Sequence, residues 1–248
     1  MIEAVSRTTI VRRAQRWVTA VIAALALVLA AQPALTVKAA EQVDQLPFVN
    51  NFATARFKLL TTVQIGDLKQ YAYGGGEVVL PDRENVWVGS DTAKDLQYVV
   101  RIGSTLYQRE GNQRWERSEG GSTDATPVSA QFNELQQIAD SIQIYGDENV
   151  GTVATTRYQV WLSGSKLVEL GGAELAGLDD ELTDLLSQTS VKYDFWIGKQ
   201  DGFLHQQNTV VYIPATTISG VDLPESQTST LIMYYDINNP RLVVNAPQ

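Results

Sequence analysis

The sequence predicts one α+β domain in which two helices pack on an antiparallel sheet of about ten or eleven strands. Short segments with alternating apolar and polar residues recur between residues 56 and 117, and glycine-, aspartate- or asparagine-containing turns separate them. This spacing favours a meander of strands over alternating strands and helices. Two longer segments repeat apolar residues at three- and four-residue steps, which is typical of amphipathic helices. One face of the sheet is the only large apolar surface that can cover them.

The clearest hairpin lies in residues 191–213, with the sequence VKYDFWIGKQDGFLHQQNTVVYI. Tyr193 and Phe195 alternate with polar residues and therefore share one face of a strand. Asp201-Gly202 supplies the turn, because glycine adopts positive φ freely and aspartate tolerates it. The apolar side of this hairpin faces either the protein's own helices alone or the helices together with a bound ligand.

The other expected strands cover residues 56–65, 71–80, 85–88, 96–102, 105–110, 114–117, 152–162, 228–237 and 241–245. Gly74, Gly75 and Gly76 lie inside the second of these, where glycines usually mark a bulge or a close approach of the backbone. A phosphate-binding loop is excluded there, because no Lys-Ser/Thr pair follows and no helix begins.

The first expected helix begins at Thr126-Pro127, continues through Phe132, Ile142 and Tyr145, and ends at Gly146. The second covers residues 173–188, with leucines on one stripe and acidic side chains on the other faces. Residues 41–55 predict a short helix or a partly ordered lead-in.

The first 39 residues have the layout of an export signal. Four arginines precede an uncharged apolar stretch at residues 18–31, and Val37-Lys38-Ala39 places small residues before a cleavage site after Ala39. The alternative is an uncleaved membrane anchor at residues 17–35. In either case residues 40–248 form a single domain that we expect outside the cytoplasm, secreted, periplasmic or at the cell surface.

Composition excludes several classes of function. The chain has no cysteine, so thiolate catalysis, N-terminal cysteine acylation and cysteine-ligated metals are excluded. Its net charge is −9, and it is more acidic still without the arginine-rich first 39 residues, so a nucleic-acid partner is not expected.

Enzymatic motifs are missing as well. The sequence contains no G-x-S-x-G elbow, and its one histidine, His205, is expected as a polar strand position rather than a catalytic base. The acidic residues of the second helix lack the spacing of a calcium loop, and we interpret them as a solvated face. We therefore expect no catalytic residue, no metal and no cofactor.

Aromatic residues are abundant in the expected strands. They include Trp87, Trp115, Trp161 and Trp196. Three roles stay open for them: packing within the core and between strands, lining a cavity for acyl chains, and stacking on sugars from an exposed surface.

Several motifs together resemble the LolA-like and LppX–LprG-like exported carriers. They are Pro81-Asp82-Arg83, the IG-x-x-x-Y-x-R pattern of residues 102–109 with the following Trp115, TTRYQVWL at 155–162, WIGKQDGFLHQ at 196–206 and YYDINNP at 234–240. The resemblance covers nearly all of residues 41–248. It implies a half β-barrel, a strongly curved antiparallel sheet whose concave face is covered by helices, with a cavity for lipid or lipoprotein acyl chains between them. The lipobox cysteine of the actinobacterial relatives is absent, and the family also includes domains that sense envelope lipoproteins.

The resulting hypothesis is an exported, non-enzymatic binder or carrier of hydrophobic ligands, with an envelope protein as a possible partner and membrane association through the N-terminal segment if it is uncleaved. The residues expected to line the cavity are Phe57, Leu59, Val63, Val86, Val88, Tyr98, Val100, Phe132, Leu135, Tyr158, Val160, Leu178, Leu182, Tyr193 and Phe195. Two alternatives stay open: a cell-surface carbohydrate-binding module with exposed aromatics, and a regulatory or structural interaction domain without a lipid cavity.

Overall fold

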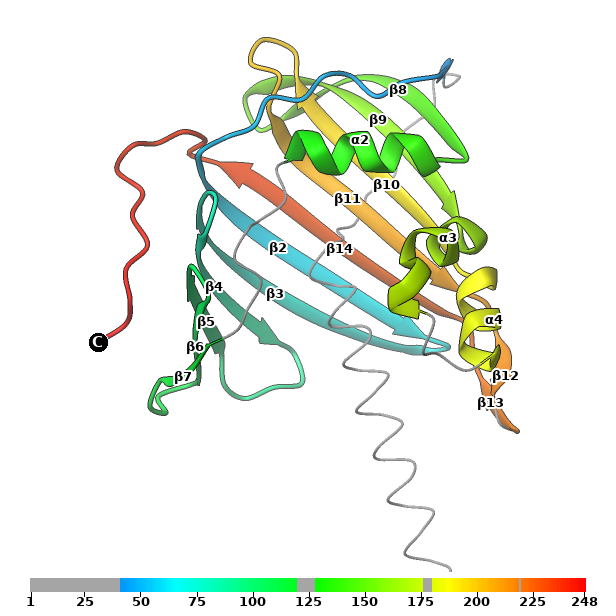
Figure 1. The fold of residues 1–248 in the computed structure, drawn as a ribbon, viewed down its shortest axis with the longest axis horizontal. Helices are drawn as coiled ribbons and strands as arrows, with labels where there is room; N and C mark the ends of the chain where they lie inside the picture. Colours follow the sequence, from blue (N-terminus) through cyan, green and yellow to red (C-terminus); the bar gives the residue numbers. More distant parts are fainter. Residues whose placement is uncertain (1–40, 120–127, 176–179, 219) are drawn as a thin grey trace, which may run out of the picture.

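The computed structural model describes residues 41–119, 128–175, 180–218 and 220–248. Figure 1 shows one broad sheet with short helices on one side of it. The sheet has twelve strands in the order β1-β8-β9-β10-β11-β14-β2-β3-β4-β5-β6-β7, and it is open, with β1 and β7 at its two edges. Neighbouring strands pair antiparallel, as the sequence predicts. A separate hairpin of β12 and β13 projects near α4.

The strands of the N-terminal half are β1 (Glu41–Val43), β2 (Thr54–Ile65), β3 (Leu68–Val79), β4 (Arg83–Ser90), β5 (Gln97–Ile102), β6 (Thr105–Glu110) and β7 (Glu116–Glu119). Those of the C-terminal half are β8 (Ser141–Val150), β9 (Val153–Ser163), β10 (Ser190–Gly198), β11 (Leu204–Ile213), β12 (Thr216–Ile218), β13 (Val221–Leu223) and β14 (Ser226–Tyr235). The helices are α2 (Val128–Ile138), α3 (Gly164–Leu175) and α4 (Asp180–Gln188).

The first helix is shorter than the sequence predicts. It ends at Ile138, and Ile142 and Tyr145 belong to β8 instead. The residues from Ser141 onward also alternate in polarity, and pairing with β9 satisfies their backbone groups along the whole segment. The apolar residues of this segment fit the spacing of a helix and the alternation of a strand, and pairing with the neighbouring strand decides in favour of the strand.

The second expected helix, at residues 173–188, is wrong in its extent. Two helices, α3 and α4, occupy this part of the chain, and α3 begins directly after β9. Two other local predictions also fail. Residues 41–43 form an edge strand and the following residues up to 53 form no helix, so of the two alternatives for this segment the helix is wrong, and residues 241–245 form an irregular tail rather than a strand.

The glycine triplet in β3 marks a close approach of backbones and not a bulge, because the pairing of β3 with β2 and β4 continues through it without a shift. A Cβ on Gly76 would lie 2.1 Å from the carbonyl oxygen of Asn85, and one on Gly74 would lie 2.4 Å from that of Trp87. No larger residue fits there without moving β4. In Figure 1, β2 and β3 show their broad face, whereas β4 to β7 turn nearly edge-on, so the sheet bends at this point.

One face of the sheet packs against the helices. The ring of Phe132, from α2, lies 4.4 Å from the ring of Phe195 in β10, and Figure 1 shows α2 crossing the sheet on this side. We call the face that carries Phe195 the helix-side face, and the face that carries Asp194 the opposite face. The main buried cluster lies on the helix side, where Val160 and Ile197 pack with Phe132 and Phe195.

The opposite face holds a buried ionic network around Asp194, which is 0% exposed. One carboxylate oxygen accepts hydrogen bonds from Arg157 (2.8 and 3.1 Å) and Gln159 (2.8 Å), and the other accepts one from Asn208 (2.9 Å). The guanidinium of Arg157 also stacks on the ring of Trp196, at 5.0 Å. These bonds link β9, β10 and β11, and they supply the partners that a buried charge requires.

We expect Asp194→Ala to lower the free energy of unfolding by about 3–5 kcal/mol, because it leaves the buried Arg157 without its main partner. The control is Glu77→Ala, which removes a partly exposed ion pair with Arg56 (2.9 Å) and is expected to cost about 1 kcal/mol or less. Urea denaturation of the two variants makes the comparison. Equal losses would contradict the role of the Asp194 network.

Candidate functional site

The predicted cavity residues of most strands share the helix-side face. Strand register places there Phe57, Leu59, Val63, Val86, Val88, Tyr158, Val160, Tyr193 and Phe195. From α2, Phe132 contacts Phe195, and Leu135 packs beside both buried clusters. Residues from β2, β4, β9, β10 and α2 are therefore brought to one side of the molecule. Their contact with a ligand stays a prediction.

Two of the predicted residues lie on the other side. Tyr98 is directly opposite Trp87, and Val100 is directly opposite Asn85, so both belong to the opposite face. In β5, Tyr98 and Val100 point away from the helices, whereas Val99 between them pairs with Val86 and lies on the helix-side face. Tyr98 instead contacts Trp115, with ring centroids 6.5 Å apart. The prediction that Tyr98 and Val100 share a face with Val86 and Val88 is wrong.

The remaining two predicted residues are not placed. Leu178 lies outside the described residues, and Leu182 belongs to α4, where its side chain is not described.

Burial changes along the helix-side face. Val160 and Phe195, near α2, are buried, whereas Phe57, Leu59 and Val88 are only half-buried. The described helices contact the other half of the sheet, α3 at β9 and α4 at β11 and β12. The apolar face therefore continues past these helices over β2, β3 and β4.

A row of small polar residues, which sequence reasoning missed, crosses the middle of this face. Thr209, Thr230 and Thr61 are neighbours across β11, β14 and β2, and all three are buried. The hydroxyls of Thr61 and Thr230 are bonded to each other at 2.9 Å. The Thr209 hydroxyl has no hydrogen-bond partner within the described structure. Threonine is common in strands for its β-branched shape, so its presence alone is no signal for a site.

Two tyrosines on this face are strongly shielded from water. Tyr193 stacks on Phe195, with centroids 5.7 Å apart, and Tyr234 packs on Phe52 at 5.5 Å. Burial raises the pKa of each phenol to about 12, because the charged phenolate loses its hydration. Both phenols therefore stay neutral to a higher pH than a free tyrosine, whose ordinary pKa of 10 already keeps it neutral at physiological pH.

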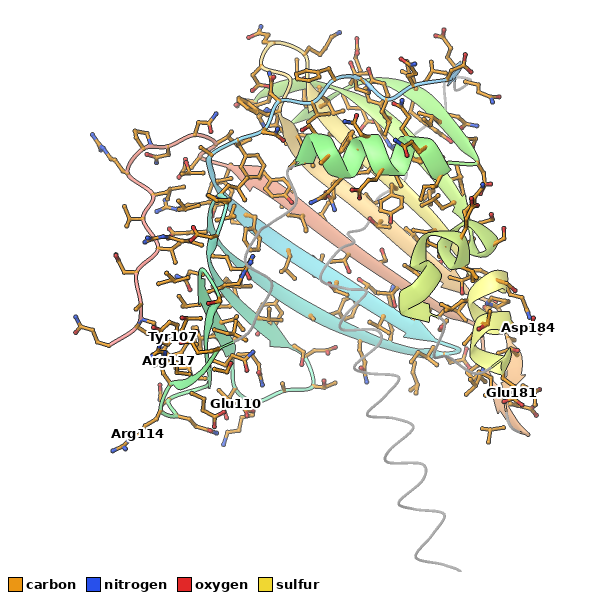
Figure 2. The ribbon with its side chains drawn as sticks, viewed as in Figure 1. Tyr107, Glu110, Arg114, Arg117, Glu181 and Asp184 are labelled. Carbon is orange, nitrogen blue, oxygen red and sulfur yellow. The ribbon has the colours of Figure 1, made fainter. Side chains whose placement is uncertain are left out.

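The described residues offer little for catalysis. No group of three or more His, Asp or Glu side chains within them could hold a metal ion. His205 bonds Asp201 at 2.9 Å and so fastens the β10–β11 turn. Glu181 and Asp184 project outward from α4 and are exposed (Figure 2). In the described part of the chain no helix is both long and apolar enough to span a membrane. The predicted signal or anchor lies outside that part.

Comparison with known proteins finds similarity at the level of solved structures. The chain is similar to LprF from Mycobacterium bovis (TM-score 0.42, 10% identity, 79% of this chain and 90% of LprF). It is also similar to the Mycobacterium tuberculosis lipoprotein LppX (TM-score 0.40, 12% identity, 78% of this chain and 90% of LppX). A third similar structure is a LolA superfamily protein from Nitrosomonas europaea (TM-score 0.28, 10% identity, 82% of this chain and 90% of that protein).

These structures belong to the groups that the sequence motifs resemble. All three TM-scores lie below 0.5, so no ligand or activity follows from them. No protein-family model and no curated protein sequence matches the chain.

We expect the protein to lose stability as pH rises from about 10 to about 12. In this range the unfolded tyrosines, with an ordinary pKa of 10, release protons that folded Tyr193 and Tyr234 retain, so the unfolded state binds fewer protons and is favoured. The expected loss is about 2–3 kcal/mol for each tyrosine. Urea denaturation across this range measures it. Tyr193→Phe and Tyr234→Phe should each reduce the loss of unfolding free energy between pH 10 and 12. An unchanged loss in both variants would contradict the raised pKa values of the two phenols.

Proposed function

We propose that this protein is an exported, non-enzymatic binder or carrier of hydrophobic ligands, such as lipid or lipoprotein acyl chains. The observation that supports it is the apolar helix-side face, which extends beyond the described helices and is half-buried over β2 to β4. Soluble domains rarely leave a contiguous apolar surface open unless it binds something.

The chemistry of the face suits an acyl chain. Phe57, Leu59 and Val63 follow one another along β2, and Val86 and Val88 face them across the glycines of β3. Burying each methylene there is worth about 0.8 kcal/mol. Gly74 and Gly76 add no side chains of their own, so Phe57 and Leu59 lie over the β3 backbone, and a Cβ on these glycines would meet them at 3.0 and 3.3 Å. The result is an apolar strip across β2 to β4, bordered on the same face by the Glu84–Arg101 ion pair (3.0 Å).

The arrangement of the helices supplies a means of entry. In this proposal the helix-side face is the concave one, and the ligand lies between it and the helices. Displacement of a helix would open the path. α2 packs on the sheet through Phe132, and the amide of Leu46, in the segment after β1, donates to Gln136 at 2.9 Å. The N-terminal 39 residues direct the chain out of the cytoplasm, and a partner in the envelope would deliver or receive the ligand.

We expect Leu59→Asp to weaken binding of a fluorescent fatty acid at least tenfold, because it places a charge in the path of the acyl chain. The control is Leu60→Asp. Leu60 is the next residue of the same strand, points to the opposite face and is 44% exposed, so its substitution should leave binding unchanged. Fluorescence titration measures both, with circular dichroism to verify folding.

Native mass spectrometry with lipid extraction, on protein purified from an exporting host, complements the titration. Co-purified acyl lipid at near-stoichiometric amounts would support the proposal. Protein free of lipid that also takes up neither fatty acid nor phospholipid would overturn it, as would equal loss of binding in the two variants.

A further inference from the structure

The opposite face of the sheet carries the exposed aromatic side chains of the described strands. They are Tyr71, Tyr73, Trp87, Trp161, Tyr212 and Tyr235, each between 38% and 45% exposed. The helix-side proposal above uses none of them. Large aromatic rings that stay open to solvent on one face mark a binding surface.

Two of these rings form a platform at the bend of the sheet. A Cβ on Gly75 would lie 3.5 Å from two atoms of the Trp87 indole, so this ring lies over the glycine. The Tyr73 ring lies over Gly89 in the same manner, since a Cβ there would come within 3.0 Å of it. The centroids of the two rings are 6.3 Å apart and their planes differ by 69°. The Trp87 side chain is 38% exposed and that of Tyr73 is 45% exposed, so a ligand can contact both rings where they meet at an angle.

Two cations lie in the same row across the strands as Trp87. Pairing sets Lys58, Gly75, Trp87, Tyr98 and Arg109 side by side from β2 to β6. Lys58 is exposed. Neither cation forms an ion pair within the described residues. With neighbouring strands about 4.8 Å apart, the row spans about 19 Å.

Arg109 is held in place by rings alone. Its guanidinium lies 4.6 Å from the centroid of Tyr98 and 4.8 Å from that of Trp115, and its Nε is buried without a hydrogen-bond partner. Figure 2 labels Tyr107, which precedes Arg109 by two residues on the same face of β6. A stacked arginine of this kind presents its remaining N–H groups to an anion in a fixed orientation.

We propose that this row, with Tyr73 beside it, binds an oligosaccharide that carries acidic groups. The C–H face of a sugar ring packs on the Trp87 indole against the Tyr73 ring, and the carboxylates or phosphates of the chain bond Lys58 and Arg109. The row is long enough for several linked sugars. It does not depend on the ligand proposed for the helix-side face.

The surroundings favour a sugar over an apolar protein surface. The exposed rings are interspersed with polar side chains, including Lys58, Asn85 and Thr62, and sugar hydroxyls can bond such groups. An interface between proteins would instead place its aromatics in a contiguous desolvated core. The chain as a whole carries a net charge of −9, so the two cations attract an acidic glycan only at short range. Added salt should therefore weaken the binding.

The test is isothermal titration of the full chain with oligogalacturonate, alginate oligosaccharides and a phosphorylated mannan, together with the methyl ester of oligogalacturonate. The ester has the same sugars without their charge. We expect binding of at least one acidic glycan. Trp87→Ala should weaken it about tenfold, and Lys58→Gln should weaken it severalfold and reduce its salt dependence. Trp87→Phe retains a ring over Gly75 and should keep most of the affinity.

The matched control is Tyr212→Ala, because Tyr212 is an equally exposed aromatic of the same face but lies on β11. It should bind like the parent. Failure of all three acidic glycans to bind at millimolar concentration would overturn the proposal, as would equal losses in the Trp87 and Tyr212 variants. Equal binding of the ester would refute the role of the cations. Self-association of the parent that disappears in Trp87→Ala, without glycan binding, would assign the surface to a protein contact instead.

Discussion

The buried carboxylate of Asp194 fixes the register on which both faces of the sheet depend. Side chains alternate along a strand, so a slip of β10 by one residue would move Asp194 into the cluster around Phe132 and move Phe195 to the opposite face. A charge in that cluster would lose all four hydrogen bonds that it has on the opposite face. Apolar burial alone tolerates such slips better, because a hydrophobic contact has no direction.

The two faces present different chemistry through the same strands. Even- and odd-numbered residues of β3 and β4 illustrate this: Val86 and Val88 face the helix side, and Trp87 between them faces away. The glycine triplet serves both faces. Gly74 and Gly76 receive Leu59 and Phe57 on one side, and Gly75 receives Trp87 on the other. A single short segment of backbone thus supports an apolar strip and an aromatic platform, back to back.

Much of the fold follows from the sequence, because alternation and turn chemistry are local. The antiparallel meander, the β10–β11 hairpin and the face shared by Phe57, Leu59 and Val63 were all predictable in this way. Among the strands with predicted cavity residues, the predicted face was wrong only for β5. There Tyr98 and Val100 are apolar enough for a core but lie on the opposite face. Nothing local distinguishes these two faces, since both carry aromatic residues.

The errors in the helices have another cause. Ile142 fits the stripe of α2 as well as the inward face of β8, and the pairing of β8 with β9 decides between them. The site is harder to predict than the fold for a related reason. The row of Thr209, Thr230 and Thr61 and the row from Lys58 to Arg109 each draw on strands far apart in the sequence, and only the strand order brings them together.

That strand order also determines when the sheet can be completed. β14 lies between β11 and β2, although it is the last strand of the chain. A chain made from its N-terminus can assemble β2 to β7 and then β8 to β11 as two separate sheets, each by local pairings. Until β14 emerges, β2 and β11 both present long unpaired edges, which are templates for association with other chains. β14 therefore joins the two sheets and removes both edges in one step, and the chain stays vulnerable to association until β14 has been synthesised.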